Sequence, residues 1–182
     1  MSTYAKEQKE RRWVLTFYGS KWFSFPKTFK YRIKAYQKHF NIGNSPIIEH
    51  NVWIQRTHGL KGTIQIGDRV LLARNCSIDY SGSVVIEDDV WISDGAQIHS
   101  HIHELTKDRI KRKGGIIPTK IILRKGCWIG NHAIILPQVG EIGENSIVAA
   151  GAVVSKSVPD NVVVAGNPAK IIKHLDFESH DK

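Results

Sequence analysis

Aliphatic residues return at every sixth position through most of this chain. A helix would space apolar residues three and four apart and a β-meander would alternate them, so neither pattern fits. A period of six is typical of a hexapeptide β-helix, in which three six-residue units close one triangular coil. Fifteen positions follow this period with three restarts, which predicts five coils. The positions are Ile48, Ile54, Leu60, Ile66, Leu72, Ile78, Ile86, Ile92, Ile98, Leu123, Ile129, Ile135, Ile142, Val148 and Val154.

The fourth residue after most of these positions is small or aliphatic, and we expect both sets to point into the core. This second set comprises Val52, Ile64, Val70, Cys76, Val90, Ala96, Cys127, Ala133, Val139, Ser146 and Ala152. Gly, Asn and Asp are common just after the aliphatic positions, where the chain must turn a corner and where positive φ suits them. No coil can bury its inward side chains alone, so the coils must stack into one continuous core.

Two segments without the period flank the repeats. Residues 1–45 are rich in aromatic and basic residues, with an amphipathic helix predicted over Lys27–Phe40. We expect this segment to cap the open end of the β-helix, where strand edges would otherwise be exposed. The alternative is peripheral contact with a membrane. The chain then divides into a cap of residues 1–45, a β-helix of residues 46–160, and a C-terminal segment of residues 161–182 that forms a turn and a short helix.

Charge and cysteine usage narrow the cellular setting. The net charge is +9, concentrated in residues 6–38 and 107–125, which indicates either a solvated basic surface or attraction of anionic ligands. Cys76 and Cys127 fall among the small inward residues, so we expect free core thiols, as in a reducing compartment. No run of 18 apolar residues and no secretory signal is present. These features predict a cytoplasmic protein, and the alternative role of residues 1–45 would place it at the inner face of the membrane. We expect no nucleic-acid partner.

The repeat stops after Ile98 and returns at Leu123. Residues 101–121 are therefore predicted to leave the coil as an excursion loop, and long loops in compact domains are usually functional. Three histidines alternate where the coil breaks, at His99, His101 and His103. On a strand this spacing would place three imidazoles on one side, and imidazole serves as a base near neutral pH or binds metal.

Four stretches of sequence carry a family resemblance. They are Ile92–Ile98 (ISDGAQI) followed by His103, Cys127–Gly130 (CWIG), Ala150–Pro159 (AGAVVSKSVP) and Val164–Lys173 (VAGNPAKIIK). Over about residues 46–175 the chain resembles the hexapeptide-repeat acetyltransferases, most closely the maltose/galactoside and sugar O-acetyltransferase branch. The resemblance implies a left-handed parallel β-helix, an exception to the usual right-handed crossover. It also implies a homotrimer with active sites between neighbouring columns.

The same resemblance implies roles for particular residues. His103 stands where the family has its catalytic base, although Glu104 replaces the usual Pro after it. His101 is the second candidate for the base and is otherwise assigned to substrate binding. Asn75 matches the residue beside the acceptor hydroxyl. The positions matching the acetyl-CoA site are Trp128, Gly130, Asn131, Ala150, Ser155, Lys156 and Lys173. Lys173 stands where Arg is common, which keeps the charge but loses a bidentate fork.

The leading hypothesis is an acetyl-CoA-dependent O-acetyltransferase acting on a hydroxyl of a sugar or glycan precursor, with no metal. A neutral imidazole would take the hydroxyl proton during direct attack on the thioester. A backbone N–H at the Gly130–Asn131 corner is a candidate donor to the oxyanion. Arg109, Lys111, Arg112 and Lys113 in the excursion would suit an acidic or nucleotide-linked acceptor.

Three other functions stay open. An amino-sugar N-acetyltransferase would use the same base and donor with an amine acceptor. A γ-type carbonic anhydrase would bind zinc through histidines such as His99, His101 and His103, although that spacing does not resemble the distribution of ligands in that family. A β-helix that serves as a scaffold would consume no thioester.

Overall fold

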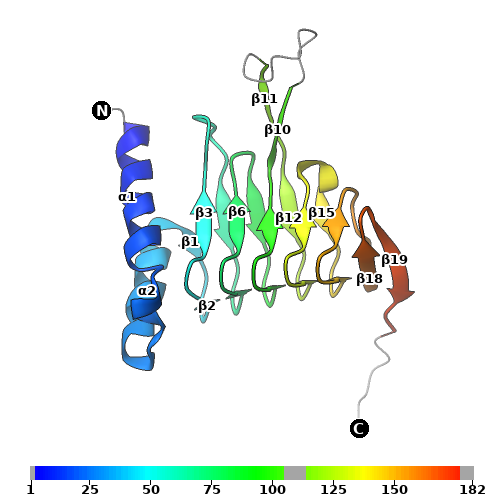
Figure 1. The fold of residues 1–182 in the computed structure, drawn as a ribbon, viewed down its shortest axis with the longest axis horizontal. Helices are drawn as coiled ribbons and strands as arrows, with labels where there is room; N and C mark the ends of the chain where they lie inside the picture. Colours follow the sequence, from blue (N-terminus) through cyan, green and yellow to red (C-terminus); the bar gives the residue numbers. More distant parts are fainter. Residues whose placement is uncertain (1–2, 105–113, 177–182) are drawn as a thin grey trace.

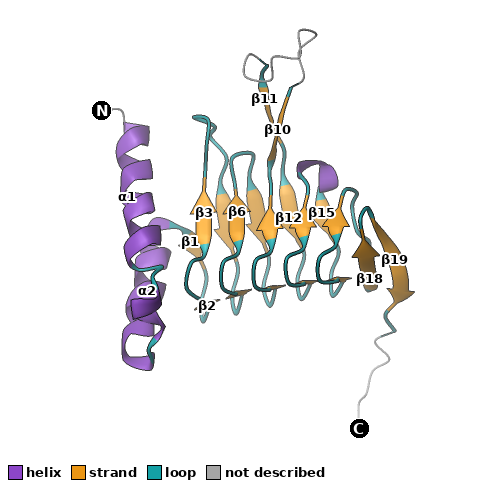
Figure 2. Cartoon of the chain, in the orientation of Figure 1, coloured by secondary structure: helices purple, strands orange, loops and turns teal. Residues whose placement is uncertain are grey.

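Short parallel strands stack into a column with two helices at one end and a β-hairpin at the other (Figure 1). The computed structural model describes residues 3–104 and 114–176. Colouring by secondary structure shows that helix is concentrated at the N-terminal end, whereas the column consists of strands joined by turns (Figure 2). The parallel β-helix predicted from the six-residue period is confirmed.

Three parallel sheets form the sides of the column. Sheet A contains β1 (Asn41–Ile42), β4 (Ile64–Ile66), β7 (Val84–Ile86), β12 (Ile121–Leu123) and β15 (Glu141–Ile142). Sheet B contains β2 (Ile47–Ile48), β5 (Leu71–Leu72), β8 (Trp91–Ile92), β13 (Trp128–Ile129), β16 (Ile147–Val148) and β18 (Val162–Gly166), with β19 (Ala169–His174) at its edge. Sheet C contains β3 (Trp53–Gln55), β6 (Ser77–Asp79), β9 (Gln97–Ile98), β14 (Ile134–Ile135) and β17 (Val153–Val154).

Equivalent residues of successive coils lie directly over one another. Leu72 pairs with Ile92, which pairs in turn with Ile129. These inward side chains are almost completely buried, as are all members of the second predicted set, so both sets line the core. Cys76 and Cys127 are free and buried, and burial raises the pKa of each thiol to about 12.

One of the fifteen predicted core positions is wrong. Leu60 lies in the connection between β3 and β4 and is only partly buried, and Ile42 of β1 takes the missing place in the first coil. His58 and Gly59 both have positive φ, which turns the chain away from the coil before it reaches Leu60. The twelve residues from Ile54 to Ile66 therefore contain one long connection rather than two hexapeptides.

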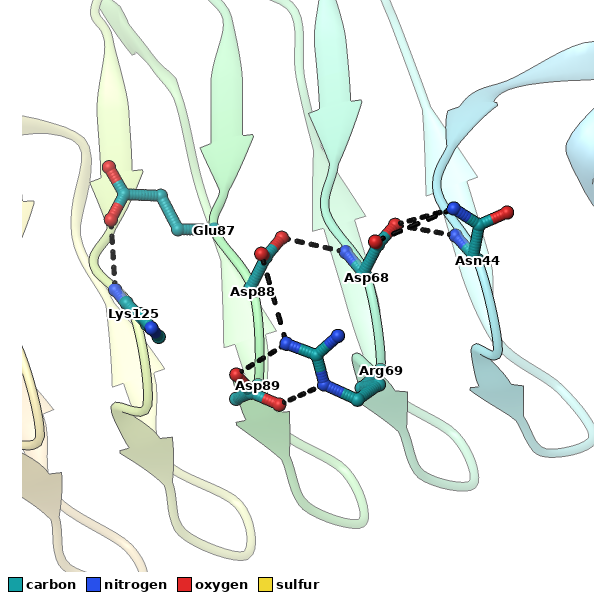
Figure 3. A network of polar contacts seen from close by, with 7 residues as sticks. All are labelled: Asn44, Asp68, Arg69, Glu87, Asp88, Asp89 and Lys125. Carbon is teal, nitrogen blue, oxygen red and sulfur yellow. Dashed lines mark hydrogen bonds and ion pairs between the residues drawn. The ribbon is translucent and has the colours of Figure 1, made fainter.

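Side-chain carboxylates join the coils at the corner between sheets A and B (Figure 3). Asp68 Oδ1 accepts a hydrogen bond from the Asn44 backbone N–H at 2.7 Å, and Asp88 Oδ1 accepts one from the Asp68 N–H at 2.8 Å. A Cβ on Gly67 would lie 2.3 Å from Asp88 Oδ1, so only glycine allows this approach. At the same corner the Lys125 backbone N–H donates a hydrogen bond to Glu87 Oε2 at 2.9 Å. Arg69 forms exposed ion pairs there with Asp88 and Asp89.

The N-terminal helices cover the first coil. Helix α1 (Thr3–Phe17) and helix α2 (Pro26–His39) flank a short 3-10 turn, Lys21–Ser24, and α2 confirms the helix predicted over Lys27–Phe40. Arg32 is fully buried and donates to the carbonyl oxygens of Tyr18, Ile48 and Ser20. The Tyr36 hydroxyl donates to Val52 O at 2.9 Å, so polar groups of the cap satisfy carbonyls at the end of the column.

The other end of the column is closed by a hairpin, and the predicted C-terminal helix is wrong. Strand β18 continues sheet B in parallel with β16, and β19 then returns antiparallel to β18. Gly166, with a φ of 94°, begins the turn. Ile171 and Ile172 are β-branched, and such residues suit a strand better than a helix, which favours the hairpin in this segment.

Replacing Tyr36 with Phe tests the contact between cap and column. The change removes the hydroxyl that satisfies a buried carbonyl, so we expect Tyr36→Phe to lower the free energy of unfolding by about 1–3 kcal/mol. Tyr31 is half exposed, and Tyr31→Phe serves as the matched control with little change. Urea unfolding at one fixed protein concentration measures both. Equal midpoints for the two variants would contradict the inferred role of Tyr36.

The outward face of the cap combines exposed aromatic side chains with positive charge. Trp22 is 79% exposed, Phe25 62% and Trp13 57%. Residues 3–40 contain seven Lys and three Arg against two Glu, which gives this segment a net charge of +8. None of the described helices is both long and apolar enough to cross a membrane. Interfacial aromatic and basic residues suit the surface of an anionic bilayer, so peripheral contact stays a prediction.

Vesicle binding tests this surface without removing the cap. We expect the protein to sediment with vesicles that contain phosphatidylserine, less so with phosphatidylcholine alone, and less at high salt because basic residues supply part of the attraction. The double variant Trp22→Ala, Phe25→Ala should bind several-fold more weakly. Ile172→Ala, an exposed apolar change at the far end of the column, is the control. Identical sedimentation of the two variants would end the membrane hypothesis.

Candidate active site

The predicted excursion leaves the column as an antiparallel hairpin between sheets C and A. Strands β10 (His101–His103) and β11 (Ile116–Pro118) pair, with His101 opposite Pro118 and His103 opposite Ile116. The hairpin projects beyond the column in Figure 1. The basic residues expected to border the acceptor, Arg109, Lys111, Arg112 and Lys113, lie outside the described residues.

A buried carboxylate positions the first histidine of this hairpin. Asp79, at the end of β6, is 4% exposed, and its Oδ2 lies 2.6 Å from Nδ1 of His101. The Ser81 hydroxyl and the Ser81 and Ser100 backbone N–H groups also donate to this carboxylate. Burial alone would raise the pKa of Asp79, but these hydrogen bonds outweigh it and hold the pKa below its usual value. An ionised carboxylate can only accept, so His101 donates its Nδ1–H to Asp79 and keeps the lone pair on its Nε2 free.

His101 is also one of three imidazoles that lie close together, with those of His58 and His103. The rings of His101 and His103 lie 5.1 Å apart, and His58 lies 5.1 Å from His101 and 5.0 Å from His103. One nitrogen from each ring lies within 4.8 Å of the others. His58 comes from the connection between β3 and β4 and has a φ of 57°. The connection after the first coil and the hairpin after the third thus converge at one edge of the column, on either side of Asp79 in the second coil.

His99 is not part of this cluster, which corrects the expectation that three alternate histidines share one side. Strand β9 ends at Ile98, and the Ser100 side chain is buried, so the chain bends between His99 and β10. The backbone N–H of His99 donates to Ile135 O at 3.0 Å. Burial lowers the pKa of His99, the charge of Asp79 opposes this shift, and His101 reinforces it. His99 is therefore a partly buried, neutral imidazole near pH 7.

Asn75 and Trp128 make their contacts elsewhere on the column. Asn75 occupies the corner between sheets B and C with a φ of 60°, and its Oδ1 accepts a hydrogen bond from Asn51 Nδ2 at 3.1 Å. Trp128 is 43% exposed on the outer side of sheet B, where its Nε1 donates to Ser93 Oγ at 2.7 Å. Its ring meets that of Trp91 edge to face.

The glycine at the Gly130–Asn131 corner serves coil stacking. The Gly130 N–H donates to Val148 O at 2.8 Å, and a Cβ there would lie 2.6 Å from the same oxygen. The Gly130 N–H is therefore already paired, which argues against it as the oxyanion donor considered from the sequence. The residue with positive φ at this corner is His132, while Asn131 is exposed.

The remaining predicted residues lie near the C-terminal end of the column. Ala150 is exposed at the next corner between sheets B and C, and Ser155 and Lys156 follow β17. Lys173 lies in β19 opposite Val163. Among the predicted site residues, His101 and His103 contact each other at the hairpin. Asn75, Gly130, Asn131 and Ala150 lie along a different edge, between sheets B and C, where Gly130 packs against the Ala150 backbone.

Two functional candidates escaped the sequence analysis. Asp79 directly follows an inward aliphatic residue, and a carboxylate at the end of a core strand is a signal that could have found it. His58 was hidden because Leu60 was counted as a repeat position. If His58 and Gly59 had been recognised as a turn, the imidazole of His58 would have been predicted to lie outside the coil.

Comparison with known proteins agrees with this architecture. No family model matches the chain. Galactoside O-acetyltransferase of Escherichia coli is 31% identical over 147 residues, which are 80% of this chain and 60% of that protein. A maltose O-acetyltransferase from Clostridium difficile superposes with a TM-score of 0.81 at 23% identity, over 94% of this chain and 88% of the other. The chain has the hexapeptide-repeat acetyltransferase fold.

A second solved structure extends the comparison. A hexapeptide-repeat acetyltransferase from Vibrio cholerae, in complex with acetyl coenzyme A, superposes with a TM-score of 0.80 at 23% identity, over 94% of this chain and 88% of the other. The resemblance to the hexapeptide-repeat acetyltransferases that the sequence motifs predict is confirmed. At these identities the structures establish the fold, and the chain spans about 60% of the length of its E. coli relative.

Proposed function

We propose that the protein is an acetyl-CoA-dependent O-acetyltransferase that modifies a hydroxyl of a sugar or glycan precursor. The observation that carries this proposal is the pair of adjacent imidazoles, His101 and His103, beside the buried carboxylate of Asp79. Similarity to galactoside O-acetyltransferase supports the reaction class and the sugar acceptor. Acetyl coenzyme A in the complex of a protein with the same fold supports the acyl donor.

His103 is the general base in this proposal. It is exposed at the root of the hairpin, where an acceptor can reach it, and a neutral imidazole removes the hydroxyl proton as the oxygen attacks the thioester. His101 is held by Asp79, so its Nε2 accepts a hydrogen bond from the acceptor and orients it. The acetyl group passes directly to the oxygen, and the proton that His103 takes is returned to the coenzyme A thiolate.

The site is completed between subunits of a homotrimer in this proposal. The residues assigned to the donor, among them Trp128, Asn131 and Lys156, lie on faces and corners away from His103 in one chain. Lys156 and Lys173 are exposed cations suited to the cofactor phosphates. Ile47, Trp91 and Trp128 are 48%, 54% and 43% exposed along the outer side of sheet B, and such an apolar row favours side-by-side association. Asn75 lies near the acceptor from a neighbouring column.

An amino-sugar N-acetyltransferase differs from this proposal in its acceptor alone. The same base and donor residues would act on an amine. Measuring coenzyme A release separates the two: turnover with galactosides, maltose or other sugars that carry no amine supports the O-transferase, whereas turnover with amino sugars alone supports the N-transferase.

Removing the base tests the chemistry. We expect His103→Ala to lower kcat/KM by ~10²–10⁴-fold, because positioned general-base catalysis contributes that much. Coenzyme A release from acetyl-CoA, measured with the acceptor that gives the highest rate, provides the assay. His39→Gln, a histidine change in the cap, is the control and should retain activity. Wild-type activity in His103→Ala would exclude His103 as the base.

Mixing two inactive variants tests whether subunits share the site. His103→Ala and Trp128→Ala should each be strongly impaired as pure proteins. The two variants are mixed in equal amounts, denatured and refolded together. In random cyclic trimers, each site takes His103 from one subunit and Trp128 from the next, so about a quarter of the sites contain both wild-type residues. We therefore expect recovery of about that fraction of activity. Mixed trimers without recovery, confirmed by differently tagged chains, would place both residues in a site within one subunit.

A further inference from the structure

The histidine cluster has the composition of a metal site, apart from any role in acyl transfer. His58, His101 and His103 each offer one nitrogen, and these atoms lie within 4.8 Å of one another. In a tetrahedral zinc site with Zn–N bonds of about 2.0–2.1 Å, ligand nitrogens lie roughly 3.3 Å apart, so each pair would close by at most about 1.5 Å. All three residues lie on a loop or a projecting hairpin, where a movement of this size is local.

Asp79 gives the cluster the support that histidine ligands have in metal sites. Metal-binding imidazoles usually donate their second ring N–H to a carboxylate, which fixes the tautomer and the ring orientation. His101 does this through Nδ1, 2.6 Å from the 4% exposed carboxylate of Asp79. Its Nε2 is thereby left as the nitrogen available to an ion.

The loop that carries His58 is anchored to the same buried network. The Thr57 N–H donates to Ser81 Oγ at 2.9 Å, and the Ser81 hydroxyl donates in turn to Asp79. Arg56 Nη1 donates to Gly62 O at 3.1 Å and closes the base of the loop. A single polar network thus links Thr57, the residue before His58, to His101.

We propose that His58, His101 and His103 form a zinc-binding site and that a bound Zn²⁺ ion inhibits the enzyme reversibly. Three neutral imidazoles and an open fourth position are a known donor set for Zn²⁺. Each imidazole has one lone pair for bonding, so a nitrogen of His103 bound to zinc is not available to take a proton. The inhibition rests on the proposed function, whereas the binding site does not depend on it.

Zinc titration of the full-length, chelator-treated protein tests the site. In competition with a chromophoric zinc chelator we expect one Zn²⁺ per chain, with affinity at least tenfold lower in His58→Ala. Asp79→Asn should lower the affinity by about 10–100-fold, the usual effect of removing such a carboxylate. His132→Ala, an exposed histidine at another edge, should bind like the wild type. Equal affinity of the wild type and His58→Ala would overturn the site.

An activity assay tests the inhibition separately. We expect one equivalent of Zn²⁺ to suppress coenzyme A release by the wild type and a chelator to restore it. His58→Ala should lose this sensitivity when the activity of each protein with zinc is compared with its own activity in the presence of chelator. Equal inhibition of the two proteins would overturn the inhibitory mechanism. If no chain shows transferase activity, the proposed function fails, while the zinc affinities still decide the metal site.

Discussion

Hydrogen bonding between successive coils is the interaction on which the rest of the structure depends. Strands in the column are mostly two or three residues long, too short to be stable alone, and each finds its partners in the coils before and after it. The corners need support as well, because the backbone leaves the sheet there with N–H groups still to be paired. Asp68 and Asp88 accept those groups, and Gly67 provides the space for them.

The sequence predicted the column well because its core is periodic. Inward side chains recur at fixed spacing, so the aliphatic positions and the small residues after them revealed both the fold and the stacking. Errors arose where a tertiary contact decides the structure. Leu60 has the spacing of a core residue but follows a turn at His58 and Gly59, and the segment at Ile171 becomes a strand because the edge of β18 is available to pair with it.

The candidate site was predictable only in part, because it is assembled from loops of different coils. The alternation of His101 and His103 is visible in the sequence, and they do meet. His58 precedes them by more than forty residues, and only the stacking of coils brings it near. The same holds for Asp79, whose role depends on the buried hydrogen bonds from Ser81 and Ser100. Residues known by resemblance alone, such as Trp128 and Lys173, lie apart in a single chain.

The two covered ends of the column have a consequence for assembly. A stack of identical coils is in principle a polymer that could lengthen by adding another molecule to either exposed rim. Here Arg32 and Tyr36 occupy carbonyls at the first rim, and at the last rim β19 runs antiparallel to the other strands of sheet B. Growth along the axis is thereby terminated, and the long flanks are left as the surfaces through which copies can recognise each other.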